Sequence, residues 1–126
     1  MKIAILGSGF IARFYADAMV AHRRKDVITM VYSRSEANAK NFADDYKVPN
    51  FTTGIQECVR HKDVEVVIIA LSNDMHLEAV LACAAAGKHV LCTKPLGRNA
   101  QEALQMLQAV DKANIAKAAN RNFFMW

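Results

Sequence analysis

The chain has 126 residues, of which 53% are apolar and 22% are charged, and its formal net charge is +4 at pH 7. This length suffices for one folded domain with one core, and the composition excludes extensive disorder. The positive charge is modest, so it allows anionic ligands without indicating nucleic acid. No apolar run reaches the length of about 18 residues that a membrane-spanning helix needs.

Short apolar segments alternate with segments of helical periodicity along the chain. We expect strands over residues 2–6, 27–32, 48–51, 64–70, 88–92 and 115–119. We expect helices over residues 10–22, 36–46, 54–60, 74–86 and 99–112. This alternation predicts an α/β fold: a single Rossmann domain whose doubly wound parallel sheet has about six strands in the order 3-2-1-4-5-6.

Polar residues and one glycine mark where several of these helices begin or end. The expected caps are Ser35, Thr52 or Thr53, Asn73 and Asn99 at the starts of helices, and Gly87 after the end of one. In the first helix, Phe10, Phe14 and Met19 fall at helical spacing.

A glycine motif follows the first expected strand and opens the first helix. It fits G-x-G-x-x-G/A and consists of Gly7, Ser8, Gly9, Phe10, Ile11 and Ala12. Gly7 allows a tight turn, Gly9 lets a pyrophosphate approach the backbone, and Ala12 lets helix and strand pack closely. The free N–H groups at the start of the helix would face the phosphates. The alternative is an ordinary glycine-rich turn that binds nothing.

The residues after the second strand bear on the choice of cofactor. Sites for NAD usually carry a carboxylate there, which binds the ribose 2′-hydroxyl. This chain instead has Ser33, Arg34 and Ser35, and the nearest carboxylate is Glu36 in the next helix. Two hydroxyls and a guanidinium can bind a 2′-phosphate, so we expect NADP, with NAD as the alternative. A solvated polar loop remains possible on this pattern alone.

Two further segments follow the fourth and fifth strands, where the nicotinamide half of the cofactor would lie. The first contains Leu71, Ser72, Asn73 and His76, and the second contains Thr93, Lys94 and Pro95. Lys94 could act as an acid or base next to the nicotinamide, and its bond to Pro95 has a sizeable cis population. The alternatives are a helix cap for Asn73, a partly buried helix residue for His76 and a surface lysine for Lys94.

These segments together resemble the Gfo/Idh/MocA oxidoreductases. The resemblance covers essentially the whole chain and is carried by GSGFIA, by SRS, by N-x-x-H within LSNDMH and by AGKHVLCTKPLGRN. It implies a pyrophosphate site at the glycine turn and a lysine, here Lys94, beside the nicotinamide and the substrate. It also implies that Asn73 and His76 line the cofactor pocket. The pair Asn120 and Arg121 resembles a segment near the active site of the family.

Two features depart from this family. Thr93 stands where the family's E-K-P motif has glutamate, and a second domain of roughly 200 residues that supplies most substrate contacts in the family is missing. We therefore expect a cofactor-binding domain over residues 1–119 and the start of a crossover over residues 120–126. The apolar residues at 123–126 are expected to be exposed and to favour self-association, giving a homo-oligomer.

The expected function is that of a domain from an NADP-dependent oxidoreductase. Its parent would transfer a hydride between the cofactor and a sugar-like or polyol small-molecule substrate, and the 126-residue chain alone would be inactive. The alternative is a nucleotide-binding regulatory module without catalysis. Three cysteines, Cys58, Cys83 and Cys92, lack a metal-type spacing, as do the histidines. We therefore expect reduced thiols, no metal site and a cytoplasmic location.

Overall fold

The computed structural model describes residues 1–22, 25–113 and 124–125. Its sheet has the order β3-β2-β1-β4-β5-β6, and every neighbouring pair of strands is parallel. The strands are β1 (Lys2–Leu6), β2 (Val27–Tyr32), β3 (Asn50–Thr52), β4 (Val66–Ile69), β5 (His89–Thr93) and β6 (Phe124–Met125). The predicted order of the first five strands is confirmed.

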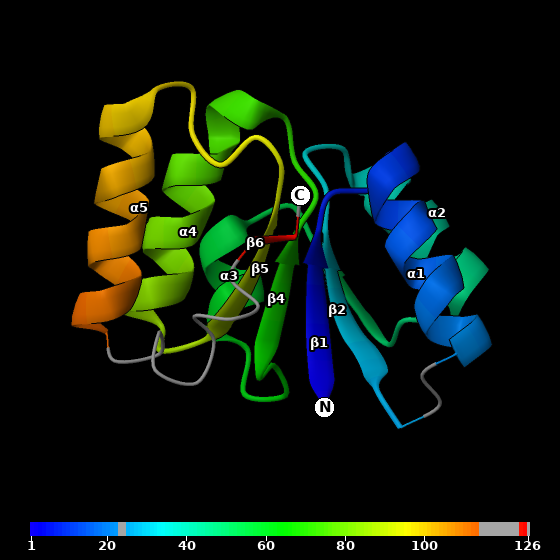
Figure 1. The fold of residues 1–126 in the computed structure, drawn as a ribbon. Helices are drawn as coiled ribbons and strands as arrows, with labels where there is room; N and C mark the ends of the chain where they lie inside the picture. Colours follow the sequence, from blue (N-terminus) through cyan, green and yellow to red (C-terminus); the bar gives the residue numbers. More distant parts are fainter. Residues whose placement is uncertain (23–24, 114–123, 126) are drawn as a thin grey trace.

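Helices cover both faces of this sheet (Figure 1). They are α1 (Phe10–His22), α2 (Glu36–Tyr46), α3 (Ile55–Arg60), the 3-10 helix η1 (Asn73–Met75), α4 (His76–Ala85) and α5 (Ala100–Lys112). Helices α1 and α2 lie against one face, and α3, α4 and α5 lie against the other. This is the doubly wound arrangement that the alternation of strands and helices predicted.

Strand β1 shows how the sheet divides the core into two layers. Ile3 and Ile5 pack with residues of α1 and α2, whereas Ala4 and Leu6 pack with residues of α3, α4 and α5. Each of these four side chains is buried. Because apolar layers cover both faces, the strand can be apolar throughout.

The expected caps of α2 and α5 are confirmed. The Asn38 backbone N–H donates to Ser35 Oγ over 3.3 Å, and the Glu102 backbone N–H donates to Asn99 Oδ1 over 2.9 Å. Gly87 has a φ of +70°, in the left-handed region, just beyond the end of α4. A side chain there would be strained, which explains a glycine at this position.

The start of α3 differs from the prediction. The N-cap is Gly54, which has no side chain to cap the helix. Thr52 lies at the end of β3, where its Oγ1 accepts from the Gly54 N–H over 3.1 Å and donates to Glu57 over 2.7 Å. Thr52 thus shapes the turn before the helix instead of capping it.

One other expectation about helices was wrong. Asn73 does not cap a long helix: it opens η1, and the α-helix begins only at His76. Helix α1 has its expected bounds, and of the three apolar residues noted on it, Met19 is buried, whereas Phe10 is 81% exposed and Phe14 is 58% exposed. The buried face of α1 is formed instead by Ala12, Ala16 and Met19, so small residues carry the contact with the sheet.

The expectations for the end of the chain mostly lie outside the described residues. These include the strand over 115–119, Asn120 and Arg121, and the side chains of the apolar segment at 123–126. Within the described part, β6 pairs with β5 through Cys92 with Phe124 and Thr93 with Met125. The domain boundary and the self-association remain predictions.

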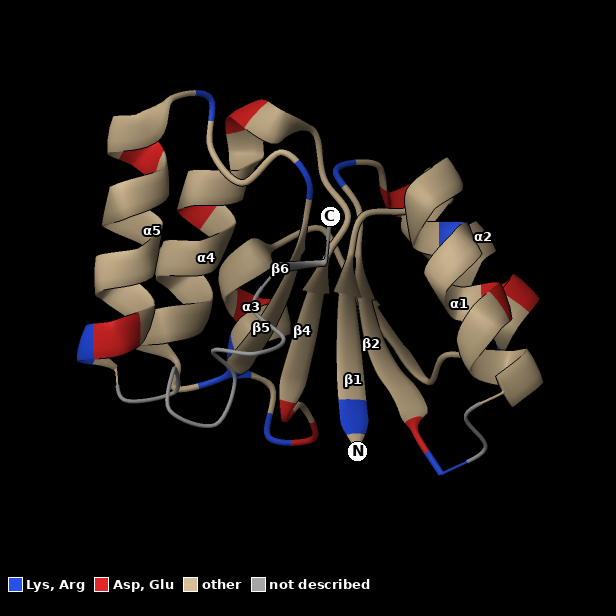
Figure 2. Cartoon of the chain, viewed as in Figure 1, with Lys and Arg blue, Asp and Glu red and all other residues tan. Residues whose placement is uncertain are grey.

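Several polar contacts tie the chain together at the amino-terminal end of the sheet. Lys2 Nζ forms an ion pair with Asp63 at 3.0 Å. Lys88 Nζ donates to the carbonyl oxygens of His61 and Val64 over 3.1 and 2.6 Å. Figure 2 shows charged residues at both ends of the sheet, including Lys and Arg in the loops that follow β2 and β5.

Across the described ranges, no helix is both long and apolar enough to cross a membrane.

Candidate cofactor site

The glycine turn is fixed between the ends of two neighbouring strands. The Gly7 N–H donates to the Tyr32 carbonyl over 2.8 Å. Gly7 has a φ of +120°, and a Cβ at this position would collide with the carbonyl oxygen of Ala70. Only glycine therefore fits here, for reasons that lie within the fold itself.

Gly9 differs from Gly7 because the fold itself does not require a glycine at this position. No atom lies within 4 Å of the place that a Cβ would occupy, and its φ is not in the left-handed region. The first hydrogen bond of α1 runs from the Arg13 N–H to the Gly9 carbonyl over 3.0 Å. The N–H groups just before Arg13 therefore lack partners within the helix, as at any helix start. Open space beside free donors and a positive helix end suits a phosphate.

Ala12 is completely buried among the residues beneath α1. Its small side chain brings the helix close to the sheet, as the motif predicted. The start of α1 is thereby held at the carboxyl-terminal edge of the sheet, next to the turn that would receive the phosphates.

The residues after β2 meet the glycine turn through a pair of hydroxyls. Ser8 Oγ and Ser33 Oγ lie 2.8 Å apart, and Ser33 is buried. Ser35 is half-buried, and its Oγ accepts the α2 cap bond, which leaves its O–H able to donate at the same time. Arg34 is exposed between the two serines. The predicted group of two hydroxyls and a guanidinium thus borders the phosphate turn.

Arg34 also acts electrostatically on the segment that follows β4. The hydrogen bond from Ser72 lowers the pKa of Asp74, and the nearby charges of Arg98 and Arg34 lower it further. The Asp74 carboxylate is therefore ionised at neutral pH. Arg34 and Asp74 are thus close enough for their charges to interact across the carboxyl-terminal edge of the sheet.

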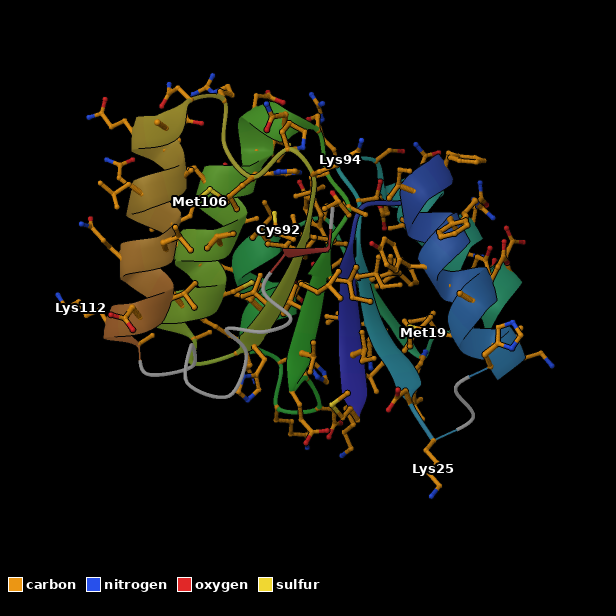
Figure 3. The ribbon with its side chains drawn as sticks, in the orientation of Figure 1. Met19, Lys25, Cys92, Lys94, Met106 and Lys112 are labelled. Atoms are coloured by element: carbon orange, nitrogen blue, oxygen red, sulfur yellow. The ribbon has the colours of Figure 1, made fainter. Side chains whose placement is uncertain are left out.

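A hollow of about 380 Å³ lies at this edge of the sheet. It is lined by Phe10, Ile11, Phe14, Tyr15, Ala70, Leu71, Thr93 and Lys94. Figure 3 shows Lys94 at the carboxyl-terminal end of the sheet, opposite the end near Lys25. The structure therefore brings together five predicted residues from three segments: Phe10, Ile11, Leu71, Thr93 and Lys94.

Sequence reasoning missed three residues of this hollow. Ala70 directly precedes the predicted segment after β4, and Phe14 lies one helical turn after Phe10, on the same side of α1. Tyr15 is partly buried beside them, and this burial raises the pKa of its hydroxyl. The helical spacing of Phe10 and Phe14 could have indicated Phe14, if the helix face that they share had been interpreted as facing a ligand.

The turn after β5 contains Lys94 and Pro95, whose peptide bond is cis. Thr93 is buried, while Lys94 and Pro95 are exposed. Lys94 thus lies at the mouth of the hollow, where a ligand could reach it.

Asn73 and His76 are less open to a ligand than Lys94. His76 is 1% exposed, and its ring lies between backbone carbonyls of the segments after β4 and β5. The Oδ1 atom of Asn73 is buried and has no hydrogen-bond partner within the described ranges. An unpaired buried acceptor of this kind calls for a donor, which a ligand could bring.

A family model described as an oxidoreductase family with an NAD-binding Rossmann fold, GFO_IDH_MocA, matches residues 1–119. The chain belongs to the Gfo/Idh/MocA family. The glycine turn, the Ser33–Ser35 segment and Lys94 all lie within the matched residues, whereas Asn120 and Arg121 lie beyond them.

The relatives that this chain is similar to include a reductase and a dehydrogenase. The chain is 30% identical over 118 residues to 1,5-anhydro-D-fructose reductase from Ensifer adhaerens, covering 94% of this chain and 35% of that protein. It is 32% identical over 126 residues to human trans-1,2-dihydrobenzene-1,2-diol dehydrogenase, covering 99% of this chain and 35% of that protein. The chain therefore spans about a third of the length of these relatives.

Among solved structures, levoglucosan dehydrogenase in complex with NADH matches with a TM-score of 0.81 and 28% identity. The match covers 88% of this chain and 32% of that one. The fold of the chain therefore agrees with the family assignment made from its sequence. The match also shows that a protein with this fold binds a nicotinamide dinucleotide.

The remaining candidates for chemistry lie away from this site. A second hollow, of about 290 Å³, is lined by residues such as Met19, Val27 and Tyr46, and no predicted site residue borders it. Cys58, Cys83 and Cys92 are buried and unpaired. In the part of the chain that the structure describes, no group of three or more His, Cys, Asp and Glu side chains is placed to hold a metal ion.

Proposed function

We propose that this Gfo/Idh/MocA domain binds NADP(H) in an oxidoreductase that acts on a hydroxyl or carbonyl of a sugar-like or polyol substrate. The observation that carries the proposal is the open space beside Gly9 at the start of α1, the helix whose Phe10 and Ile11 line the same hollow as Lys94. The names of the relatives support the substrate class, since they include an anhydrofructose reductase and a dihydrodiol dehydrogenase.

The residues of the site divide between the two halves of the cofactor. The free backbone N–H groups at the start of α1, just before Arg13, would bind the pyrophosphate, and the Ser33–Ser35 segment would bind the adenosine end. The apolar wall formed by Ile11, Phe14 and Leu71 would exclude water from the nicotinamide end.

Lys94 would give a proton to the substrate oxygen during reduction or take it during oxidation. It lies at the mouth of the hollow and its side chain is exposed, so a bound substrate can reach its amine. The cofactor itself supplies the hydride chemistry. The protein's part in this step is to hold the lysine and the nicotinamide on the same side of the substrate carbon.

The chemistry of the Ser33–Ser35 segment favours NADP over NAD. A carboxylate at this position would repel a 2′-phosphate, and the nearest one, Glu36, is exposed on α2. The hydroxyls of Ser33 and Ser35 and the guanidinium of Arg34 supply hydrogen-bond donors for the 2′-phosphate, which NADP carries and NAD lacks. The NADH complex of levoglucosan dehydrogenase supports NAD as the alternative.

Calorimetric titration of the chain with NADPH and with NADH tests the proposal. We expect both to bind, NADPH more tightly. Failure of both nucleotides to bind would overturn the assigned function, whereas equal or tighter binding of NADH would overturn only the choice of cofactor.

We also place the protein in the cytoplasm, since its three buried cysteines are unpaired, as in a reducing compartment.

A further inference from the structure

His76 connects two segments that the backbone hydrogen bonds of the sheet no longer join. Its Nδ1 lies 2.7 Å from the Pro95 carbonyl oxygen and 3.3 Å from that of Leu96. Its Nε2 lies 2.9 Å from the carbonyl oxygen of Leu71. The side chain is 1% exposed, so water does not replace these contacts.

The His76 bridge lies just beyond the paired residues of β4 and β5. The last residues that pair between β4 and β5 are Ile69 and Cys92. Leu71 and Pro95 lie beyond this pair, each two residues after the end of its strand. The imidazole therefore connects these two segments just beyond the last paired residues of β4 and β5.

The chemistry of the ring fits this role. Carbonyl oxygens only accept hydrogen bonds, so each bond that His76 forms must use one of its own N–H groups. A neutral ring can donate through only one nitrogen at a time. The shorter contact, of Nδ1 with the Pro95 carbonyl at 2.7 Å, is the one to which we assign the N–H. Leaving a buried carbonyl without its donor is costly, so the bridge resists rearrangement.

The Lys94 side chain makes no hydrogen bond or ion pair with the described residues, so its place depends on its backbone. Pro95 follows it directly, and the far side of the same turn is held by the Arg98 N–H, which donates to Glu102 over 2.9 Å. His76 holds the near side. The turn that presents Lys94 to the hollow is thus fixed at both ends.

We propose that His76 is a positioning residue for Lys94: by bridging Leu71 and Pro95 it sets the turn from which the lysine reaches the nicotinamide end of the hollow. This inference rests on the proposed function. Since His76 lies behind the turn and has both ring nitrogens on backbone carbonyls, it acts on Lys94 and not on the nucleotide directly.

Three substitutions separate the two sides of the bridge. His76→Phe keeps a ring but removes both nitrogens. His76→Asn keeps an amide N–H near the place of Nδ1, facing Pro95, and His76→Gln keeps one near the place of Nε2, facing Leu71. The readout is the set of nuclear Overhauser contacts between the nicotinamide C4 hydrogens of bound NADPH and the Lys94 side chain, together with the NADPH affinity.

In the unsubstituted chain we expect these contacts to be present. His76→Phe should lose them. Any accompanying loss of NADPH affinity should be smaller than the roughly tenfold loss expected of Gly9→Ala, because the glycine turn and the Ser33–Ser35 segment are untouched. His76→Asn should restore the contacts and His76→Gln should not. A general loss of folding would instead weaken NADPH binding in proportion, so the two effects are distinguishable.

Contacts that persist in His76→Phe would overturn the positioning role and leave the proposed function intact. If His76→Phe does not fold, the comparison of His76→Asn with His76→Gln decides, and equal behaviour of these two overturns the role. If the unsubstituted chain binds neither NADPH nor NADH, the proposed function itself fails. If it binds a nucleotide without contact to Lys94, the catalytic role of Lys94 fails, and in both cases the positioning role of His76 is overturned.

Discussion

The hydroxyl oxygens of Ser8 and Ser33 lie 2.8 Å apart. This contact joins the glycine turn after β1 to the end of β2, and burial of Ser33 protects it from water. The Ser33 side chain is therefore oriented before any ligand arrives. Ordering these groups in advance reduces the entropy that a nucleotide would otherwise lose on binding.

Arg34→Asp should weaken binding of NADPH much more than binding of NADH. The substitution removes a guanidinium that can pair with the 2′-phosphate and introduces a charge that repels it. A charge-assisted contact contributes about 1.5–3 kcal/mol, so we expect NADPH affinity to fall roughly tenfold or more. Calorimetric titration measures both affinities, and Arg60→Asp, an equal charge change at the exposed last residue of α3, is the control. Equal losses for both nucleotides would contradict the assigned role of Arg34.

Gly7→Ala and Gly9→Ala should have opposite effects on stability and binding. A Cβ at Gly7 meets the Ala70 carbonyl and requires a strained φ of +120°, so we expect at least about 2 kcal/mol of destabilisation. A Cβ at Gly9 meets nothing, so stability should not fall, whereas NADPH affinity should fall about tenfold as the phosphates are displaced.

Chemical denaturation and calorimetry on the same two variants provide the measurements, and each variant serves as the control for the other. Unchanged NADPH affinity in Gly9→Ala would show that the open space at this turn does not receive the pyrophosphate.

Lys94→Ala in the complete enzyme should lower kcat by about 100-fold or more, since general acid and base groups contribute this much. NADPH affinity should stay nearly intact, because Lys94 lies beyond the phosphate turn at the end of the hollow. Steady-state kinetics and calorimetry distinguish the two effects. Lys112→Ala, at the far end of α5 (Figure 3), is the control. Normal turnover in Lys94→Ala would reduce this residue to a surface lysine.

The three cysteines should not react with thiol reagents in the folded protein at neutral pH. Burial raises the pKa values of Cys58 and Cys92 to about 12 and also raises that of Cys83. Almost no thiolate is therefore present, and the reagent has no access to the sulfur atoms. Colorimetric thiol titration should find all three groups only after denaturation. Rapid reaction of any cysteine in the folded chain would contradict its buried position.

The start of α5 should contribute stability that depends on pH. Hydrogen bonds from the Arg98 side chain and backbone lower the pKa of Glu102 below its usual value of 4.5. Its stabilisation is therefore complete above the unfolded-state pKa and is lost as the pH falls through the lower folded-state value. The difference in free energy of unfolding between the original chain and Glu102→Gln should shrink over this acidic range. Arg98→Ala should reduce the pH dependence, and a constant difference would contradict the assignment.

The sequence predicted most of the strands and helices because their apolar residues follow the period of each element and their caps are local. Ser35 and Asn99 cap helices through bonds to residues three positions away, so nearby sequence suffices. Thr52 could not be assigned in this way, because its hydroxyl is engaged by Glu57 and Gly54 together.

The hollow was harder to predict than the phosphate turn. Its wall comes from α1, the segment after β4 and the end of β5, and its shape depends on how these parts pack. Periodicity shows that Phe10 and Phe14 share a helix face but not whether anything covers that face. The bridge formed by His76 depends likewise on backbone carbonyls, which no sequence pattern displays.

The ion pair of Lys2 with Asp63 and the bonds of Lys88 lie at the opposite end of the sheet from the ligand-facing loops. These anchoring contacts are therefore separated from the end of the sheet where we propose that the nucleotide binds. Loops at this second end, such as Ser33–Ser35, can vary without disturbing the contacts at the first end. A loop transplanted from a relative of different nucleotide preference would still have to supply a partner for Ser8 and a cap for α2, which Ser33 and Ser35 provide here.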